Sequence, residues 1–376
     1  MRIAVIGSRG MPGVPGGIER HVEELYPRLA RLGVDVTVYA RREYGCRSRT
    51  VSGVRVVALP SYGGRYGEAL SHTALSLLHA SRGGFDLLHM HAMGPGVLLP
   101  FARLLGLTPA VLTFHTFDYK RSKWGPGARA FLRFSEFVSL RSADAIIAVS
   151  ELATRHIWEK YHRSARYIPN GPGGLRRREP GAFMQKLGLA PGGYVLAVGR
   201  LSPEKCLEDL IAAHEQALPD VSLVLVGDTS FTDGYVARLR ALAGPRVVFT
   251  GYLHGEALEE LYSSALIFAL PSDLEGASLS LLEAMSLQCA IVASDIPANR
   301  EALGDPPTAI TFPAHDCAAL AVALGDLARD AAQRERLGRA AAARVRDAFD
   351  WDRIAASTLQ VYESVLRERV DSVKPQ

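Results

Sequence analysis

Residues 194–200 read Y-V-L-A-V-G-R, and they repeat the pattern of residues 2–8, R-I-A-V-I-G-S. Each stretch is an apolar, strand-like run that ends at a glycine and leads through a polar loop into a helical pattern. Apolar and amphipathic runs alternate in this way along both halves of the chain, which is typical of βαβ units built on parallel sheets. The repeat therefore predicts two doubly wound, Rossmann-like α/β domains.

The other strands and helices follow the same alternation. In the first half we expect strands at residues 3–6, 34–39, 54–58, 86–89, 110–113 and 145–149, with helices at 18–32, 66–80 and 128–140. In the second half we expect further strands at 222–226, 246–249, 266–270, 290–293 and 309–312, followed by a helical tail after residue 316. Residues 168–181 are rich in Pro, Gly and Arg, which indicates a linker. We place an N-terminal domain at 1–170, a linker at 171–185 and a C-terminal domain at 186–350.

Length and composition agree with a two-domain globular protein. The chain has 376 residues, more than one ordinary core needs. Its net charge of +4 is compatible with an anionic substrate or membrane surface and does not require nucleic acid as a partner. Four scattered cysteines, no leader-like start and no apolar run of about 18 residues predict a reduced, cytosolic chain without a membrane span.

A glycine-rich loop at residues 7–17, G-S-R-G-M-P-G-V-P-G-G, follows the first strand. It matches a dinucleotide-binding fingerprint only loosely, because two prolines interrupt it and the second strand ends without the acid that would bind a ribose. We therefore reject NAD. Gly16 and Gly17 stand directly before a helix. They either form an ordinary surface loop or bring backbone N–H groups up to an anion, and we favour the anion site.

The corresponding loop of the second half reads G199-R-L-S-P-E-K205. Arg200 would offer a forked donor and Lys205 a point charge to a diphosphate at the mouth of the cleft between the domains. The alternative is an ordinary solvated loop.

Two glutamates flank a helix start in L274-E-G-A-S-L-S-L-L-E-A-M285. Glu275 is expected in the loop and Glu283 within the first turns of a helix that begins near Ser278 or Ser280. Backbone amides at the positive helix end would hold the charged middle of an elongated ligand, and the two carboxylates would accept hydrogen bonds from hydroxyls at its two ends. Alternatively, Ser280-x-x-Glu283 is a capping box.

Together these motifs resemble the GT-B-fold, retaining glycosyltransferases of family 4 (group 1), over essentially the whole chain. The resemblance is carried by P-G-G-I-E-R-H-V at 15–22, G-R-L-S-P-E-K at 199–205, F-T-G-Y-L at 249–253 and the two glutamates. The opening loop and D118-Y-K-R-S-K-W-G125 look closest to bacterial rhamnosyl- and glucosyltransferases of surface-polysaccharide assembly. Such a fold implies two domains that face each other across a cleft, with the last helix, 351–370, crossing back onto the first domain.

The resemblance also implies a set of donor-binding residues: Gly16, Gly17, His115, Arg200, Lys205, Tyr252, Glu275, Gly276, Ala277, Ser278, Leu279 and Glu283. His115, Arg200, Lys205 and Glu275 form its catalytic part. Glu283 would bind the ribose hydroxyls, and Glu275 would bind the donor sugar together with the amides of residues 276–279. Ala277 and Ser278 depart from the E-G-F-G of many relatives, which leaves the donor sugar open.

The implied roles continue around the donor. Arg200 and Lys205 would hold the diphosphate, and Gly16 and Gly17 would contact it from the first domain. His115 would contact the sugar near its anomeric centre, and Tyr252 would lie at the base. Cations and a helix N-terminus stabilise the charge that builds on a departing nucleoside diphosphate. No D-x-D stands at a strand end, so we expect no metal or other cofactor, and the nucleotide-sugar is a substrate.

A histidine pair lies at a strand end. His89 and His91 would present their side chains on one face of the strand. Because no third ligand is expected nearby, we set zinc aside. His91 could instead line the acceptor side of the site.

A basic stretch interleaved with aromatics follows the fifth strand. Its cations are Lys120, Arg121, Lys123, Arg129 and Arg133, and its aromatics are Phe131, Phe134 and Phe137. One interpretation is a helix packed by its aromatics, with a solvated basic face. The other is peripheral docking on the anionic inner membrane, where a lipid-linked acceptor would lie.

The sequence thus predicts a metal-independent, retaining transferase that moves a sugar from a nucleotide-diphosphate donor to a glycan or lipid-linked acceptor. Two alternatives remain. A UDP-sugar epimerase would share the fold, and a non-catalytic nucleotide-sugar-binding protein would keep several of the same residues.

Overall fold

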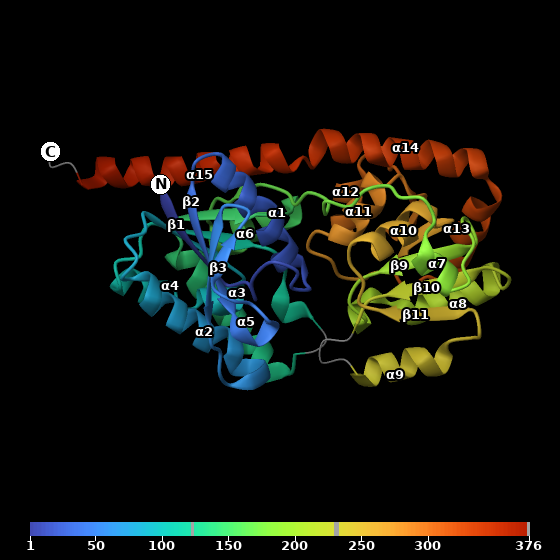
Figure 1. Ribbon diagram of the computed structural model, residues 1–376, viewed down its shortest axis with the longest axis horizontal. Coiled ribbons are helices and arrows are strands. Elements are labelled where there is room, and N and C mark those ends of the chain that lie inside the picture. The colour runs from blue at the N-terminus through green and yellow to red at the C-terminus, as the bar shows by residue number, and fades with distance from the viewer. Residues whose placement is uncertain (122–123, 229–232, 374–376) are drawn as a thin grey trace. The chain divides into compact units, whose positions relative to one another are not determined.

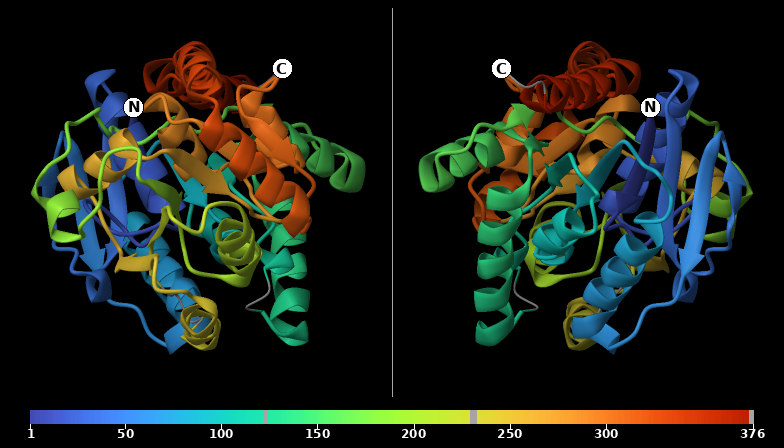
Figure 2. Two further views of the ribbon diagram at one scale, coloured as in Figure 1. Left: turned by 90° about the vertical axis from the view of Figure 1, so that its right-hand side faces the viewer. Right: turned by 90° about the vertical axis from the view of Figure 1, so that its left-hand side faces the viewer.

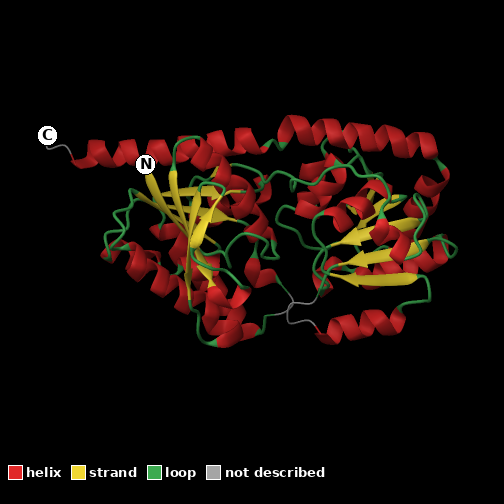
Figure 3. Cartoon of the chain, viewed as in Figure 1, coloured by secondary structure: helices red, strands yellow, loops and turns green. Residues whose placement is uncertain are grey.

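The computed structural model describes residues 1–121, 124–228 and 233–373 and contains two compact units (Figure 1). The first unit comprises Met1–Lys120, Trp124–Gly171 and the chain from Trp351 onward. The second comprises Arg121 and Pro172–Asp350 among the described residues. Each unit holds one sheet with helices on both of its faces (Figures 2 and 3), which confirms two doubly wound, Rossmann-like domains.

The first unit is built on an eight-stranded sheet of order β3-β4-β2-β1-β5-β6-β7-β8. Only β3 runs antiparallel to its neighbour β4. The strands are β1 (Arg2–Ile6), β2 (Asp35–Arg41), β3 (Arg49–Val51), β4 (Val54–Leu59), β5 (Leu87–His91), β6 (Ala110–Phe114), β7 (Ala145–Ala148) and β8 (Arg166–Tyr167). The α-helices are α1 (Gly17–Arg31), α2 (Gly64–Ala80), α3 (Met93–Gly96), α4 (Leu99–Leu104), α5 (Pro126–Ser142), α6 (Glu151–Tyr161) and α15 (Trp351–Val373). Short 3-10 turns lie at η1 (Arg42–Tyr44) and η2 (Asp118–Lys120).

The second unit has a six-stranded parallel sheet of order β11-β10-β9-β12-β13-β14. The strands are β9 (Tyr194–Val198), β10 (Ser222–Val226), β11 (Val247–Gly251), β12 (Ile267–Leu270), β13 (Ile291–Ser294) and β14 (Ile310–Phe312). The helices are α7 (Ala182–Lys186), α8 (Leu207–Ala217), α9 (Asp233–Leu242), α10 (Glu256–Ser264), α11 (Leu279–Ser286), α12 (Pro297–Leu303), α13 (Cys317–Arg329) and α14 (Ala331–Ala348). A 3-10 turn, η3 (Pro203–Lys205), precedes α8.

The first strand of each unit lies inside its sheet, between strands that come later in the sequence. β1 pairs with β2 on one side and β5 on the other, and β9 pairs with β10 and β12. Residues 3–6 and 194–196 are fully buried because helices cover both faces of the sheet. This position explains why the two opening runs are continuously apolar, and it places the loop after each strand at the carboxyl edge, where doubly wound folds bind ligands.

Helix α15 packs on the core of the first unit. Trp351, Ile354 and Tyr362 belong to the same buried cluster as β1 and α1. The Arg28 guanidinium lies over the Trp351 ring at 5.9 Å and donates to Asp352 at 3.1 Å. Trp351 therefore packs the start of α15 onto this core.

The connection at residues 168–181 contains no helix or strand, as its composition predicted. Its later part packs against the second unit. Arg178 makes ion pairs at 3.0 Å with Glu256 and with Glu259, and Leu175 packs on the apolar core there.

One interpretation of the sequence was that the aromatic side chains of α5 pack this helix against the rest of the domain, and the structure differs from it. Phe131, Phe134 and Phe137 are 40%, 58% and 48% exposed. The side that packs inward carries Leu132, Ser135, Glu136, Ser139 and Leu140 instead. Two of the buried polar side chains have partners, because Ser139 Oγ donates to the Ser135 carbonyl at 2.6 Å and Glu136 accepts from Tyr161 at 2.6 Å. The expected packing role of the phenylalanines is therefore wrong.

Among the described residues, no helix is both long enough and apolar enough to cross a bilayer.

Candidate functional site

The glycine loop of the first unit leads into α1 where the sequence predicted. The helix begins at Gly17, and Gly16 is its N-cap with φ of +146°, a conformation that favours glycine. A Cβ on Gly16 would lie 2.0 Å from Glu19 Oε2, so a larger residue would collide with that carboxylate. No described side chain caps this helix start.

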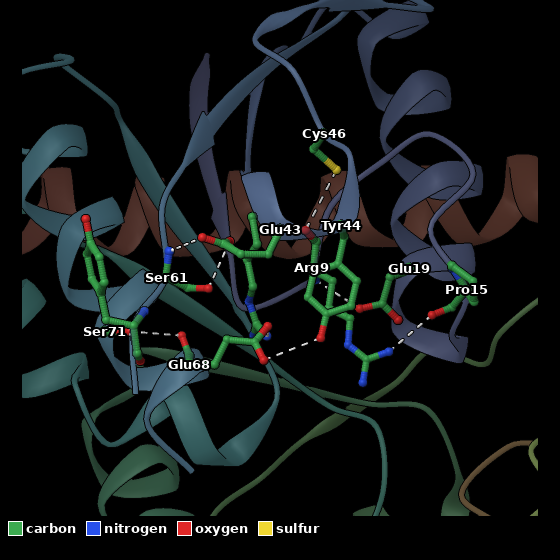
Figure 4. Close-up of polar contacts among 11 residues, drawn as sticks. Arg9, Pro15, Glu19, Glu43, Tyr44, Cys46, Ser61, Glu68 and Ser71 are labelled. Atoms are coloured by element: carbon green, nitrogen blue, oxygen red, sulfur yellow. Dashed lines mark hydrogen bonds and ion pairs between the residues drawn. The ribbon is translucent and has the colours of Figure 1, made fainter. Parts of the chain in front are cut away.

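Glu19 and Arg9 fix the loop, and the sequence analysis missed both (Figure 4). The buried Glu19 carboxylate accepts from the Arg9 backbone N–H at 2.9 Å, and the Arg9 guanidinium donates to the Pro15 carbonyl at 3.3 Å. The carboxylate therefore already lies beside the helix start that was expected to meet an anion. A bound anion here would have to be stabilised by the helix amides against this neighbouring negative charge.

A wider polar network extends from the same loop (Figure 4). The Arg9 guanidinium lies over the Tyr44 ring at 5.1 Å, and the Tyr44 hydroxyl donates to Glu68 at 3.4 Å. The other oxygen of Glu68 accepts from Arg41 at 2.8 Å. These contacts join the loops after β1 and β2 to the start of α2. No sequence motif predicts these contacts, because the residues that make them come from separate parts of the chain.

His115 follows β6 directly and is nine-tenths buried. Its Nε2 lies 2.8 Å from Nδ1 of His91, the last residue of the neighbouring strand β5. The ring of His21, one turn into α1, lies 4.9 Å from the His115 ring and 5.3 Å from the His91 ring, measured between centroids. One ring nitrogen from each of these three histidines falls within 4.8 Å of the others. The expectation that the His89/His91 pair has no third ligand nearby is therefore wrong.

Behind His91 the hydrogen bonds continue into the core. The Tyr26 hydroxyl lies 2.5 Å from His91 Nε2 and 2.8 Å from His89 Nδ1. His89 in turn contacts the Tyr362 hydroxyl at 2.5 Å and Thr113 Oγ1 at 2.7 Å. These buried contacts show that His89 is a structural member of the network.

Burial keeps the histidines of this edge neutral. It lowers the pKa of His21 to about 4 and that of His89 to about 3, and it lowers the pKa of His91 and His115 well below 6.5. Desolvation is the main cause, since an imidazolium loses its hydration inside the protein. His115 therefore acts as a neutral hydrogen-bonding imidazole and not as a cation at neutral pH.

The second unit brings Lys205 and Glu275 together at its carboxyl edge. Lys205 Nζ lies 2.5 Å from Glu275 Oε1, and the two side chains are only 17% and 11% exposed. Lys205 ends the 3-10 turn η3, and α8 begins two residues later at Leu207. A small pocket at the ends of β9 and β12 is lined by Gly199, Arg200 and Lys205, among others.

Helix α11 starts beside this pair. Its N-cap is Ser278 and its first residue is Leu279, while Gly276 and Ala277 lie in the loop before it. Ser280 is therefore already inside the helix, so the capping box expected as the alternative role of Glu283 is wrong. Glu283 is buried, and its Oε2 accepts from the Tyr262 hydroxyl at 3.1 Å. Ser278 Oγ contacts Ser280 Oγ at 3.2 Å and does not cap the helix.

Tyr252 follows β11 and is 45% exposed, with its ring 6.1 Å from that of His254. The structure thus gathers the predicted residues into two groups. Gly16, Gly17 and His115 lie at the carboxyl edge of the first sheet. The residues from Arg200 to Glu283 lie in the loops and helix starts of the second unit.

The basic stretch around α5 is exposed where it is described. Lys120, Arg129 and Arg133 are exposed, as are the three phenylalanines, whereas Arg121 is half-buried and Lys123 lies outside the described residues. The Arg133 guanidinium lies over the Tyr119 ring at 5.2 Å. This face combines exposed cations with exposed aromatic rings.

Two Rossmann-like units with polar loops at the carboxyl ends of their strands are characteristic of the GT-B class of fold. Sucrose-phosphate synthase from Thermosynechococcus elongatus shares it with a TM-score of 0.85, at 24% identity over 98% of this chain and 99% of that one. The Anabaena protein Alr3699/HepE, solved in complex with UDP-glucose, has a TM-score of 0.80 at 21% identity over 97% of this chain and 100% of that one.

Sequence comparison identifies the family. Residues 15–171 match the model described as "Glycosyltransferase Family 4", and residues 182–344 match "Glycosyl transferases group 1". The phosphatidyl-myo-inositol mannosyltransferase of Mycobacterium leprae is 31% identical over 94% of both chains. The α-maltose-1-phosphate synthase of Mycobacterium tuberculosis is 29% identical over 97% of this chain and 100% of that protein. The chain belongs to the family 4, group 1 glycosyltransferases.

Proposed function

We propose that this glycosyltransferase moves a hexosyl group, with retention and without a metal cofactor, from a nucleotide-diphosphate sugar to a hydroxyl of a glycan or lipid-linked acceptor. The observation that carries the proposal is the Lys205–Glu275 ion pair at the carboxyl edge of the second sheet, next to the start of α11. It puts a cation for a phosphate and a carboxylate for sugar hydroxyls within one hydrogen bond of each other.

In this proposal the donor spans the second unit from Tyr252 to Glu275. Glu283 accepts hydrogen bonds from the ribose, and Arg200 and Lys205 bind the diphosphate. The backbone amides of Gly276, Ala277, Ser278 and Leu279 and the Glu275 carboxylate hold the sugar. When the donor enters, Lys205 exchanges its contact with Glu275 for a phosphate oxygen, which releases Glu275 to bind the sugar hydroxyls.

The chemistry follows from where charge develops. Departure of the nucleoside diphosphate builds negative charge on a phosphate oxygen, which Lys205, Arg200 and the helix N-terminus stabilise in place. That oxygen takes the proton of the attacking acceptor hydroxyl, and the acceptor adds to the face that the leaving group vacates. His115 contributes as a neutral imidazole that can exchange a hydrogen bond with the sugar without adding charge.

The comparisons make uridine the first base to test. The Anabaena structure is a complex with UDP-glucose, and the similar proteins include a mannosyltransferase and a glycogen synthase. We propose a role in surface-polysaccharide synthesis, close to the rhamnosyl- and glucosyltransferase branch that the sequence resembles.

The acceptor side is proposed to work at an anionic membrane surface. Exposed Phe131, Phe134 and Phe137 would enter the headgroup region. The cations of the same stretch of sequence would contact anionic lipids, namely Lys120, Arg121, Lys123, Arg129 and Arg133. Co-sedimentation with vesicles containing anionic phospholipid tests this step. We expect binding that falls in Phe134→Ser and at high salt, whereas equal partition of wild type and Phe134→Ser would exclude docking through this face.

Calorimetric titration with UDP, dTDP, GDP and ADP in EDTA tests the donor site. We expect one diphosphate to bind and the others to bind much more weakly. Failure of all four would contradict the donor assignment. A UDP-sugar epimerase or a non-catalytic binding protein would also bind a diphosphate, so turnover of the matching donor must follow.

A further inference from the structure

The histidine group at the edge of the first sheet has the composition of a metal site. We propose that His21, His91 and His115 bind a divalent transition-metal ion such as Zn²⁺. Each offers one ring nitrogen, and these nitrogens lie within 4.8 Å of one another. They come from three elements, α1, β5 and the loop after β6, that the core holds in place.

The contact with Asn170 determines which nitrogen of the His21 ring can bind a metal. The side-chain oxygen of Asn170 lies 2.7 Å from His21 Nδ1 and can only accept, so the proton of this neutral imidazole is on Nδ1. The lone pair is therefore on Nε2. That nitrogen is fully buried and has no hydrogen-bond partner in the structure. A buried acceptor without a donor destabilises the protein, and a metal ion would satisfy it.

His91, like His21, has a hydrogen-bond partner on the ring nitrogen that would not bind the metal. A metal-bound histidine usually makes a hydrogen bond through its other ring nitrogen, which fixes the orientation of the ring. His91 Nε2 contacts the Tyr26 hydroxyl at 2.5 Å, which leaves Nδ1 on the side of His115. Two of the three ligands thus already have their outer partners, and the tautomer of His21 is set as well.

Only small movements separate the observed group from a metal-bound one. Tetrahedral zinc with Zn–N bonds of about 2.0–2.1 Å needs its ligand nitrogens about 3.3 Å apart. His91 Nδ1 and His115 Nε2 are 2.8 Å apart and share one proton, which must move to the other nitrogen of its ring or to solvent. The two nitrogens must then open slightly, and His21 must approach them. Rotation of the His21 and His115 rings about their side-chain bonds can supply this adjustment.

The ligand set also selects the kind of ion. Imidazole nitrogens suit Zn²⁺, Cu²⁺ and Ni²⁺, whereas Mg²⁺ and Ca²⁺ require oxygen ligands, and this group contains no carboxylate. Three histidines leave the fourth position of a tetrahedral ion open for water or another ligand.

Metal binding would have a consequence for the reaction. His115 is the histidine proposed above to contact the donor sugar, and its Nε2 would be occupied by the ion. Zn²⁺ would therefore inhibit transfer and not support it. This consequence rests on the proposed function, but the binding of metal does not.

The test is a titration of the untagged, EDTA-treated full chain with Co²⁺, followed by displacement with Zn²⁺. A second group, Cys206, Asp209 and His315, also brings potential ligands within 4.8 Å of one another, so every protein in the test carries His315→Ala. We expect one equivalent of Co²⁺ to bind with the intense visible absorption of a four-coordinate site, and one equivalent of Zn²⁺ to abolish that absorption.

Three variants in this background decide the assignment. His21→Ala should abolish the four-coordinate spectrum, and Asn170→Ala should weaken binding about tenfold or more, since loss of an outer partner typically has this effect. His72→Ala is the matched control, because His72 is equally buried and lies outside the group; it should bind as the parent does. No metal binding by the parent, or equal binding by His21→Ala and His72→Ala, would overturn the proposal.

If His21→Ala does not fold, as judged by its circular dichroism, Asn170→Ala and His91→Asn take its place. Unchanged Co²⁺ affinity in both would equally overturn the site. Because diphosphate binding is measured separately in EDTA, failure of the metal proposal can be told apart from failure of the donor proposal.

Discussion

Replacing Lys205 with methionine removes the cation of the proposed diphosphate site and keeps most of its apolar stem. A hydrogen bond to a charged group contributes about 1.5–3 kcal/mol, which corresponds to a loss of affinity of about 10- to 150-fold. The wild-type lysine must give up its contact with Glu275 when phosphate binds. We therefore expect the nucleoside diphosphate to bind about tenfold more weakly to Lys205→Met, at the low end of that range.

The Glu275 carboxylate that remains in Lys205→Met allows a second and more specific prediction. In Lys205→Met, Glu275 has lost the lysine and repels the incoming diphosphate. Adding Glu275→Gln removes this repulsion, so the double variant should bind the diphosphate more tightly than Lys205→Met. Glu275→Gln alone should keep or slightly increase diphosphate affinity because Lys205 is released, although it should abolish sugar transfer.

Isothermal titration calorimetry in EDTA measures all four affinities. Chemical denaturation of each protein provides the control for folding, and we expect Lys205→Met to lower the free energy of unfolding by about 1–3 kcal/mol, between the values for exposed and buried pairs. Equal diphosphate affinity in wild type and Lys205→Met would refute the diphosphate assignment.

Three further predictions concern other parts of the site. Gly16→Ala should lower the free energy of unfolding by about 1–3 kcal/mol, because φ is +146° and the new Cβ meets Glu19; Gly13→Ala, with open space around it, should have a smaller effect in the same denaturation assay, and equal effects would contradict the steric argument. Glu283→Gln should weaken calorimetric binding of a ribonucleoside diphosphate about tenfold but leave that of its 2′,3′-dideoxy analogue unchanged; parallel losses would exclude the ribose contact. Acid should destabilise the fold, because His21 has a pKa of about 4 in the folded protein and 6.5 in the unfolded chain, so the unfolded chain takes up a proton first as the pH drops below about 6.5. His21 alone should lower the free energy of unfolding by about 2 kcal/mol between pH 7 and pH 5. Urea unfolding curves that coincide at the two pH values would disprove the burial of His21 as a neutral ring.

The strand pattern could be predicted because of where these strands lie. Residues 3–6 and 194–196 are covered on both faces, so every position is apolar and the signal is strong. The short strands β3 and β8 and the short helices α3 and α4 went unnoticed, since a few residues carry no periodicity.

Side-chain packing on α5 could not be predicted from residue type alone. The phenylalanines were expected inside by one interpretation, yet the inner side carries Ser135, Glu136 and Ser139. Glu136 and Ser139 are stable there because partners on other elements, Tyr161 and the Met93 carbonyl, satisfy them. A sequence does not show such partners.

The candidate site, like the fold, could be predicted from the sequence only in part. Lys205 and Glu275 could each be selected from motifs, but their contact joins residues 70 positions apart and depends on β9 and β12 being neighbours. His21 was quoted within a motif and given no role, because its partners His91 and His115 approach it only once α1 packs over β5 and β6. Adjacent parallel strands explain the contact between His91 and His115, which their places after neighbouring strands could have indicated.

The most direct test of the account is turnover of the donor whose diphosphate binds. The purified protein is incubated in EDTA with that nucleotide-sugar, and release of the nucleoside diphosphate and the anomeric form of the released or transferred sugar are followed by NMR. We expect slow release with retained configuration in wild type and none in Glu275→Gln, although both bind the diphosphate. Binding without any release in wild type, or conversion of the sugar into its epimer, would contradict the claim that this protein is a retaining glycosyltransferase.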